Sequence, residues 1–221
     1  MSTKTPLTID YYSDVLCVWA WIAQRRVDEL QNYFSDQIQF SYHHIDVFGN
    51  TAVKMQSQWA DRGGYEGFGQ HVIQSAAPFE DTKVNPAIWS KVKPTTSANA
   101  HLWLKAIDSI YGADMSAKFA VTVRKAFFCD AQDISQFSVL GELSGQLGLE
   151  QAKIHQLVEN GEAIALLASD YKNAQTLNIK GSPSYVLDGG RQTLYGNVGY
   201  RVLHANIEEL LKHPKNEASW C

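Results

Sequence analysis

Hydrophobic and polar positions follow regular patterns along most of the chain. A short apolar run over residues 7–12 predicts a strand, and apolar side chains then recur every three or four residues up to Phe34, which predicts a helix. A second run over residues 38–48, rich in aromatic and β-branched side chains, predicts another strand. Strand, helix and strand in this order form a βαβ unit, whose two strands we expect to lie parallel.

The pattern weakens between Gly49 and Lys93. Four glycines gather there at positions 63, 64, 67 and 69, but no strand leads into them and their spacing does not match a phosphate-binding loop. We expect a plain surface loop, with a mobile cover beside the functional site as the alternative.

The rest of the chain is first helical and then returns to strands. Several amphipathic helices are predicted between Thr96 and about Leu177. Residues 184–187 and 191–195 read as a hairpin around a glycine turn, and a terminal helix over 202–211 ends before Pro214. The tail over residues 215–221 has no periodicity, and we expect it to be loose.

The predicted element order is βαβ, a block of helices, then ββα. With the block set aside, this is the order of a thioredoxin fold, so we predict an α/β thioredoxin-like fold with an all-helical insertion. Residues 1–92 and 165–221 would form the thioredoxin-like domain, and residues 93–164 would form the insertion.

Composition narrows the class of protein. The 221 residues are 45% hydrophobic and 19% charged, as in an ordinary globular protein, and the net charge of −4 argues against nucleic acid as a partner. No apolar run reaches the roughly 20 residues of a membrane helix. Met1–Pro6 carries no signal-like apolar segment, and three scattered cysteines cannot form a disulfide framework. We expect a cytoplasmic protein with reduced thiols, and the sequence leaves open whether it forms a homodimer.

Cys17 lies where the first strand gives way to the first helix. The unpaired N–H groups and the positive end of the helix dipole favour an anion there, so we expect the pKa of this thiol to be lowered. The sequence therefore allows two readings: a working nucleophile, or a small apolar residue packed at a helix start.

Two motifs resemble the DsbA-like family of thiol–disulfide oxidoreductases. The segment Ser13–Ala20 looks like the active-site turn of that family, and Gly181–Gly189 resembles its cis-proline segment. The helices between them resemble the family's insertion, so the likeness covers nearly the whole chain. The same superfamily is similar to kappa-class glutathione transferases and 2-hydroxychromene-2-carboxylate isomerases.

The resemblance implies roles for particular residues. Cys17 would be the catalytic nucleophile, and Ser182 with a cis-bonded Pro183 would bind an extended thiol or disulfide substrate. Trp19 would shape the substrate surface, and Asp14, Asn99 and His101 would lie near the cleft. No histidine, cysteine or carboxylate spacing predicts a metal, and we expect no tightly bound cofactor, with glutathione as a candidate co-substrate.

One departure from the family changes the expected chemistry. The family's C-x-x-C pair is replaced by Cys17-Val18-Trp19-Ala20, so Cys17 has no resolving thiol in its own turn. A single thiolate can still form a mixed disulfide that a second thiol releases. We interpret Cys129 as a buried structural thiol and Cys221 as incidental.

Two alternatives remain open at this point. A kappa-like glutathione transferase or isomerase would usually carry serine at the active-site position and an acidic residue after the last strand's glycine, where this chain has Gly196-Asn197-Val198. A non-catalytic binding protein that keeps the thioredoxin-like groove is the other alternative.

Overall fold

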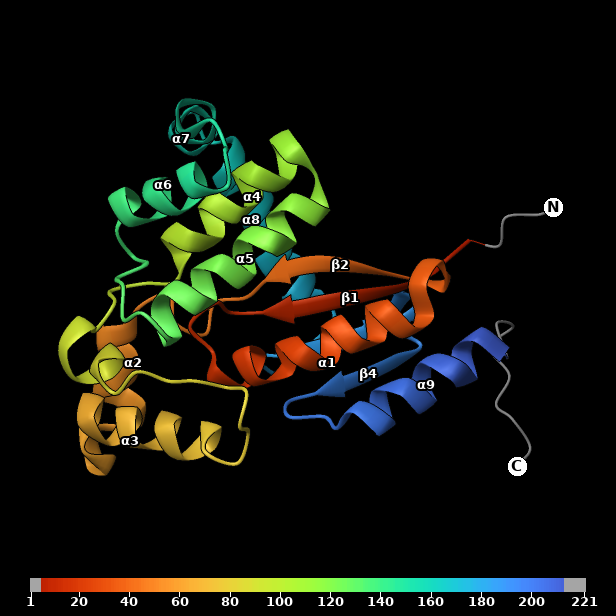
Figure 1. Cartoon of the computed structure of the whole chain (residues 1–221), viewed down its shortest axis with the longest axis horizontal. Helices are drawn as coiled ribbons and strands as arrows, with labels where there is room; N and C mark the ends of the chain where they lie inside the picture. Colours follow the sequence, from red (N-terminus) through yellow and green to blue (C-terminus); the bar gives the residue numbers. More distant parts are fainter. Residues whose placement is uncertain (1–4, 213–221) are drawn as a thin grey trace.

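The computed structural model describes residues 5–212. Within this range four strands form one mixed sheet in the order β2-β1-β3-β4 (Figure 1). β1 runs parallel to β2 with Leu7 opposite Ile38, whereas β3 lies antiparallel to both β1 and β4. The predicted βαβ unit and the predicted hairpin are therefore confirmed. The strands are β1 (Leu7–Ser13), β2 (Ile38–His44), β3 (Ser184–Leu187) and β4 (Gln192–Tyr195).

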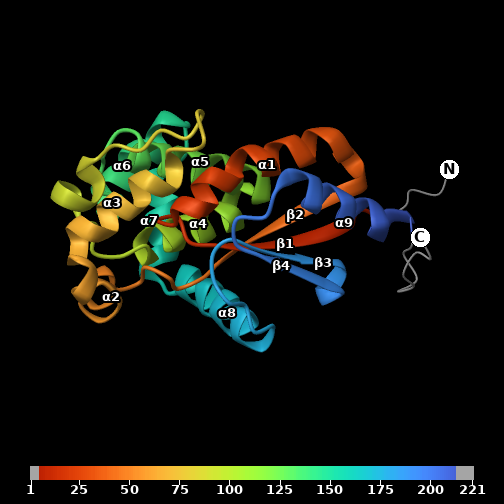
Figure 2. The same cartoon turned by 90° about the horizontal axis from the view of Figure 1, so that it is seen from below.

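Helices cover both faces of this sheet (Figure 2). α1 (Val18–Phe34) and α9 (Tyr200–Lys212) pack on one face, where Ile9 and Tyr11 of β1 are buried. α8 (Glu162–Thr176) covers the other face, on which Tyr12 is buried. The alternation of side chains along β1 thus buries the strand on both sides, and each large apolar side chain contributes about 1.5–3 kcal/mol.

The predicted block of helices is present. α4 (Ala98–Tyr111) packs against α5 (Ala113–Phe128), α7 (Gln151–Glu159) and α8. The apolar stripes of these helices form one core cluster with the first turn of α1. Cys17 belongs to this cluster and therefore lies at the junction between the sheet layer and the helical block. The block also contains α6 (Phe137–Gln146).

The prediction of a loop between Gly49 and Lys93 was wrong. This segment contains α2 (Thr51–Gln58), the 3₁₀-helix η2 (Ala60–Arg62), α3 (Gly64–Ala76) and the π-helix η3 (Ile88–Val92). α3 buries Phe68, Val72 and Ala76, which recur every four residues, against the core. The glycines obscured this stripe: a side chain at Gly67 would collide with the carbonyl group of Arg62, so the close approach of η2 requires glycine there.

Smaller elements complete the chain. These are the 3₁₀-helices η1 (Ser35–Gln37) and η4 (Asp188–Gly190). β2 ends at His44 rather than at residue 48, so residues 45–48 are free to turn toward the start of α1. The predictions made for Pro214 and for residues 215–221 lie outside the described residues. In the described range, no helix is long and apolar enough to span a bilayer.

Candidate active site

Cys17 is the N-cap residue of α1. Its backbone is extended (φ −80°, ψ 117°), its carbonyl oxygen accepts hydrogen bonds from the N–H groups of Ala20 and Trp21, and its own N–H donates to the carbonyl oxygen of Asp14. The residue is 6% exposed. The sequence between β1 and α1 thus forms a tight turn that places the sulfur at the N-terminus of the helix, as predicted.

Ser182 faces Cys17 from the segment before β3. The Cys17 thiol donates to the main-chain carbonyl oxygen of Ser182 at 3.3 Å, and the N–H of Asp14 donates to Ser182 Oγ at 3.0 Å. The Ser182–Pro183 peptide bond is cis, and both residues are buried. Two segments that are distant in sequence therefore meet at the sulfur atom.

Asp14 ties this turn to the rest of the molecule. Its side chain is fully buried, and Oδ1 accepts from the N–H of Leu16 at 2.9 Å. Oδ2 accepts from the N–H groups of Val47 and Phe48, at 3.1 and 2.9 Å, and from the hydroxyl group of Ser97 at 2.8 Å. Hydrogen bonds to a buried carboxylate stabilise a fold by about 1.5–3 kcal/mol each, so Asp14 fixes the turn relative to residues 45–48 and to the start of α4.

His101 lies directly beneath the same turn. Its Nε2 accepts from the N–H of Val15 at 3.2 Å and lies 3.8 Å from Asp14 Oδ1. Because Nε2 is an acceptor, the ring proton is placed on Nδ1, which has no partner within residues 5–212. The ring stacks on His44 with centroids 4.6 Å apart, and burial lowers the pKa of both histidines. His101 is therefore a neutral support for the turn.

Burial also decides the resting state of the Cys17 thiol. Removal from water raises the pKa of Cys17 and outweighs the opposing hydrogen bonds of Ser182, Ala20 and Trp19, while the charge of Asp14 raises it further. The prediction of a lowered pKa is wrong for this conformation, because the sulfur that the helix start would acidify is also shielded from solvent.

The other predicted residues lie around this centre. Trp19 is half-buried and packs against the core cluster that includes Cys17. Asn99 is half-buried, and its amide nitrogen donates to the carbonyl oxygen of Ser135 at 2.7 Å, which joins the start of α4 to the segment before α6.

Cys129 is partly exposed rather than buried, which corrects its interpretation as a buried thiol. Its sulfur donates to the carbonyl oxygen of Lys83 at 3.7 Å. Trp21 Nε1 donates to the same oxygen at 3.2 Å. Cys129 therefore lies closer to α1 than its place in the helical block suggested. Cys221 is outside the described residues.

Arg124 is a site residue that sequence reasoning missed. It is 2% exposed, and Nη2 donates to Ser13 Oγ at 2.9 Å beside the turn that leads to Cys17. The one available signal was its position next to the apolar stripe of α5, between Val123 and Phe127. The backbone amides of residues 47 and 48 were also missed, and no side-chain pattern could have revealed them.

A model of a known protein family covers most of the sequence. The model of the DSBA-like thioredoxin domain matches residues 8–208. The chain belongs to the DSBA-like thioredoxin family. This membership agrees with the sheet order, the helical block and the opposition of Cys17 and Ser182. No curated protein matches the sequence.

Solved structures of low sequence identity share the fold of this DSBA-like chain. A candidate protein disulfide isomerase from Nitrosomonas europaea superposes with a TM-score of 0.78 at 14% identity, covering 94% of this chain and 98% of the other. The cytosolic disulfide reductase DsbM from Pseudomonas aeruginosa gives 0.68 at 17%, covering 91% and 99%. A 2-hydroxychromene-2-carboxylate isomerase gives 0.64 at 15%, covering 96% and 100%.

Proposed function

We propose that this DSBA-like protein is a thiol–disulfide oxidoreductase that uses Cys17 as its single active-site thiol. The observation that carries the proposal is the position of the Cys17 sulfur, at the N-terminus of α1 and 3.3 Å from the Ser182 carbonyl oxygen. Ala20 occupies the place of the second cysteine of a C-x-x-C pair, so no dithiol forms within the turn.

The proposed cycle has two exchange steps. The Cys17 thiolate attacks one sulfur of a substrate disulfide, forms a mixed disulfide with it and releases the other sulfur as a thiolate. A second thiol then attacks the substrate sulfur of the mixed disulfide, which regenerates the Cys17 thiolate and yields a new disulfide. The proton that Cys17 loses before the first step goes to solvent, and the released thiolate takes one up.

Ser182 and Pro183 would bind the substrate chain beside the sulfur. The Ser182 carbonyl oxygen accepts a hydrogen bond from the protonated Cys17 thiol. When Cys17 loses its proton, this oxygen becomes available to a peptide N–H of the substrate. Trp19 would cover the bound sulfur from the first turn of α1.

Glutathione is the proposed second thiol, and the cytoplasm is the proposed location. Glutathione can release a mixed disulfide without a resolving cysteine in the chain, and cytoplasmic thiols are kept reduced. DsbM, which shares this fold, is described as cytosolic and has been solved with GSH.

Mass spectrometry after incubation with glutathione disulfide tests the proposal. We expect one glutathione on the intact protein, mapped to Cys17, and no adduct on this site in Cys17→Ala. Cys129→Ala is the matched control and should keep the adduct. An adduct confined to Cys129, or a folded protein without any adduct, would contradict the proposal.

A further inference from the structure

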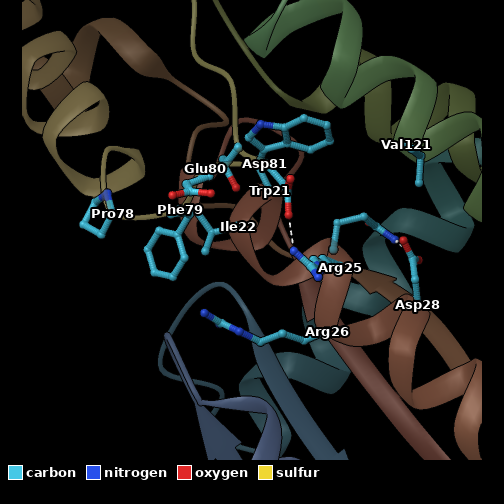
Figure 3. A pocket seen from close by; sticks show the side chains of 12 residues that line it. Trp21, Ile22, Arg25, Arg26, Asp28, Pro78, Phe79, Glu80, Asp81 and Val121 are labelled. Atoms are coloured by element: carbon cyan, nitrogen blue, oxygen red, sulfur yellow. Dashed lines mark hydrogen bonds and ion pairs between the residues drawn. The ribbon is translucent and has the colours of Figure 1, made fainter.

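A groove of about 490 Å³ runs along the exposed side of α1, between this helix and the segment 78–82 (Figure 3). Aromatic and aliphatic side chains form its floor, and charged side chains form its rim. Its lining includes Ile22, Arg25 and Arg26 on α1, and Phe79, Glu80 and Asp81 on the facing segment.

The groove lies along the helix that begins at the active-site cysteine, and Trp21 is the lining residue nearest to Cys17 in the sequence. Ile22 and Arg26 lie four residues apart on one side of α1 and both line the groove, whereas Cys17 and Val18 at the start of the helix are buried in the core. Nine residues separate Cys17 from Arg26, which corresponds to about 14 Å along the helix axis.

A second connection joins Arg26 to the segment that faces Cys17. Arg26 Nη1 donates to Asn197 Oδ1 at 2.6 Å. Asn197 directly follows Gly196, whose N–H donates to the carbonyl oxygen of Pro183 at 2.8 Å. The guanidinium group is therefore anchored to the loop between β4 and α9, which is itself hydrogen-bonded to Pro183.

Arg26 differs from its neighbour Arg25 in its partners. Arg25 forms ion pairs with Glu29 and Asp81. Arg26 contacts the neutral side chain of Asn197 and lies over the Phe79 ring, 5.5 Å from its centroid, and within residues 5–212 no carboxylate pairs with it. A guanidinium group has five N–H donors in a planar fork that matches a carboxylate, so Arg26 keeps donors for a bound anion.

The acidic side chains of the groove leave its Arg26 end open to a carboxylate. Asp81 is already paired with Arg25, and Asp28 accepts a hydrogen bond from Gln24. Glu80 is exposed and lies on the other side of Phe79 from Arg26 in Figure 3. An anionic group on a ligand would therefore meet attraction at the Arg26 end and repulsion near Glu80.

We propose that this groove binds a peptide substrate with a carboxylate group two to four residues from the cysteine that reacts with Cys17. An extended peptide covers about 3.3 Å per residue, so four residues span the distance along the helix axis from Cys17 to Arg26. Fewer residues suffice where the arginine side chain reaches toward Cys17. The half-buried ring of Phe79 offers apolar surface to a peptide in the groove, above the buried side chain of Ile22. The inference rests on the proposed function, because Cys17 is the group that fixes one end of the peptide.

The test uses three short peptides that differ in one residue. Each carries one cysteine as a mixed disulfide with thionitrobenzoate, and glutamate, glutamine or lysine stands three residues away from it. Attack by Cys17 joins the peptide to the protein and releases thionitrobenzoate, whose absorbance gives the rate. We expect the glutamate peptide to react about five- to tenfold faster than the glutamine peptide at low salt, since charge-assisted bonds to arginine are strong.

Arg26→Gln should remove this preference, so that the glutamate and glutamine peptides react at the same rate. Arg62→Gln is the matched control, because Arg62 lies over the Trp59 ring at a similar 5.4 Å but is not among the groove residues. It should keep the full preference.

The outcomes separate the two proposals. Equal rates for the glutamate and glutamine peptides in the wild type, or an equal loss for all peptides in Arg26→Gln, would overturn the groove assignment while Cys17 still reacts. If no peptide reacts, the proposed function fails, and the groove is then tested by fluorescence anisotropy with the serine analogue of the glutamate peptide. Binding that Arg26→Gln weakens would support the groove, and equal binding by both proteins would reject it.

Discussion

The Cys17 thiol donates a hydrogen bond to the main-chain carbonyl oxygen of Ser182, a residue 165 positions away in the sequence. The N–H of Asp14 binds the hydroxyl group of the same serine. These two hydrogen bonds therefore fix the turn before α1 relative to the segment before β3. Because a thiol can donate this bond and a thiolate cannot, the contact belongs to the protonated, resting form of Cys17.

This geometry makes a prediction about the pH dependence of alkylation. Burial raises the pKa of Cys17, so the reactive thiolate fraction in the resting protein should be smaller than that of a free cysteine, whose pKa is about 8.5. The rate of iodoacetamide labelling at Cys17, followed by peptide mass spectrometry, should reach half of its maximum above that pH. A midpoint below it would show that the helix start outweighs burial after all.

Replacement of Asp14 by asparagine should loosen the turn. A carboxylate accepts hydrogen bonds at both oxygens, whereas an amide accepts at its oxygen alone. A buried N–H group would therefore lose its acceptor, which lowers the free energy of unfolding by about 1–3 kcal/mol. Urea unfolding should show this loss in Asp14→Asn. Asp36→Asn, at an exposed position of η1, is the control and should unfold like the wild type. Equal stability of both variants would mean that the turn can repack around the amide.

The sequence predicted the sheet layer and the position of Cys17 because both depend on short-range patterns. The apolar run over 7–12, the helical spacing from Ala20 to Phe34 and the turn residues between them indicate β1, α1 and their junction. The same reasoning failed for α3, where Gly67 meets the backbone carbonyl group of Arg62, a contact that the sequence does not reveal.

The environment of Cys17 was beyond sequence reasoning for a different reason. A helix start favours a thiolate, but the net effect depends on how completely Ser182 and the helical block exclude water from the sulfur. Partners of Asp14 such as Ser97 and the amides of residues 47 and 48 come from other elements, so tertiary packing alone brings them together.

His43 should make the folding stability depend on pH. Burial lowers its pKa, but hydrogen bonds to Asp170 and Asp10, at 3.1 and 3.0 Å, outweigh burial and raise it overall. Lys105, 2.7 Å from Asp170, opposes the rise without reversing it. A histidine with a raised pKa stabilises the fold fully below its unfolded value of about 6.5, and this stability is lost as the pH rises through the folded value.

The stability difference between wild type and His43→Gln, measured by urea unfolding, should therefore shrink from about pH 6 to pH 8. Asp170 stays charged over this range because its pKa is lowered, so its contribution is constant. His71→Gln is a control. Burial and Arg62 lower the pKa of His71, so its contribution to folding stability should rise with pH instead of falling. A His43→Gln difference that grows with pH would exclude a protonated His43 between the two aspartates.

A thiol introduced at position 20 should change the fate of the mixed disulfide. Ala20 is fully buried in the first turn of α1, three residues after Cys17, and its N–H donates to the Cys17 carbonyl oxygen at 3.1 Å. In Ala20→Cys the new thiolate can attack the Cys17 sulfur of a glutathione adduct, form a disulfide within the turn and release glutathione as a thiol. We expect the adduct to disappear without added thiol in this variant and to persist in the wild type.

Ala23→Cys adds a thiol at an equally buried position one turn further, out of reach of Cys17, and should keep the adduct. An adduct that survives as long in Ala20→Cys as in Ala23→Cys would mean that the closed packing around Cys17, and not the missing cysteine, prevents resolution.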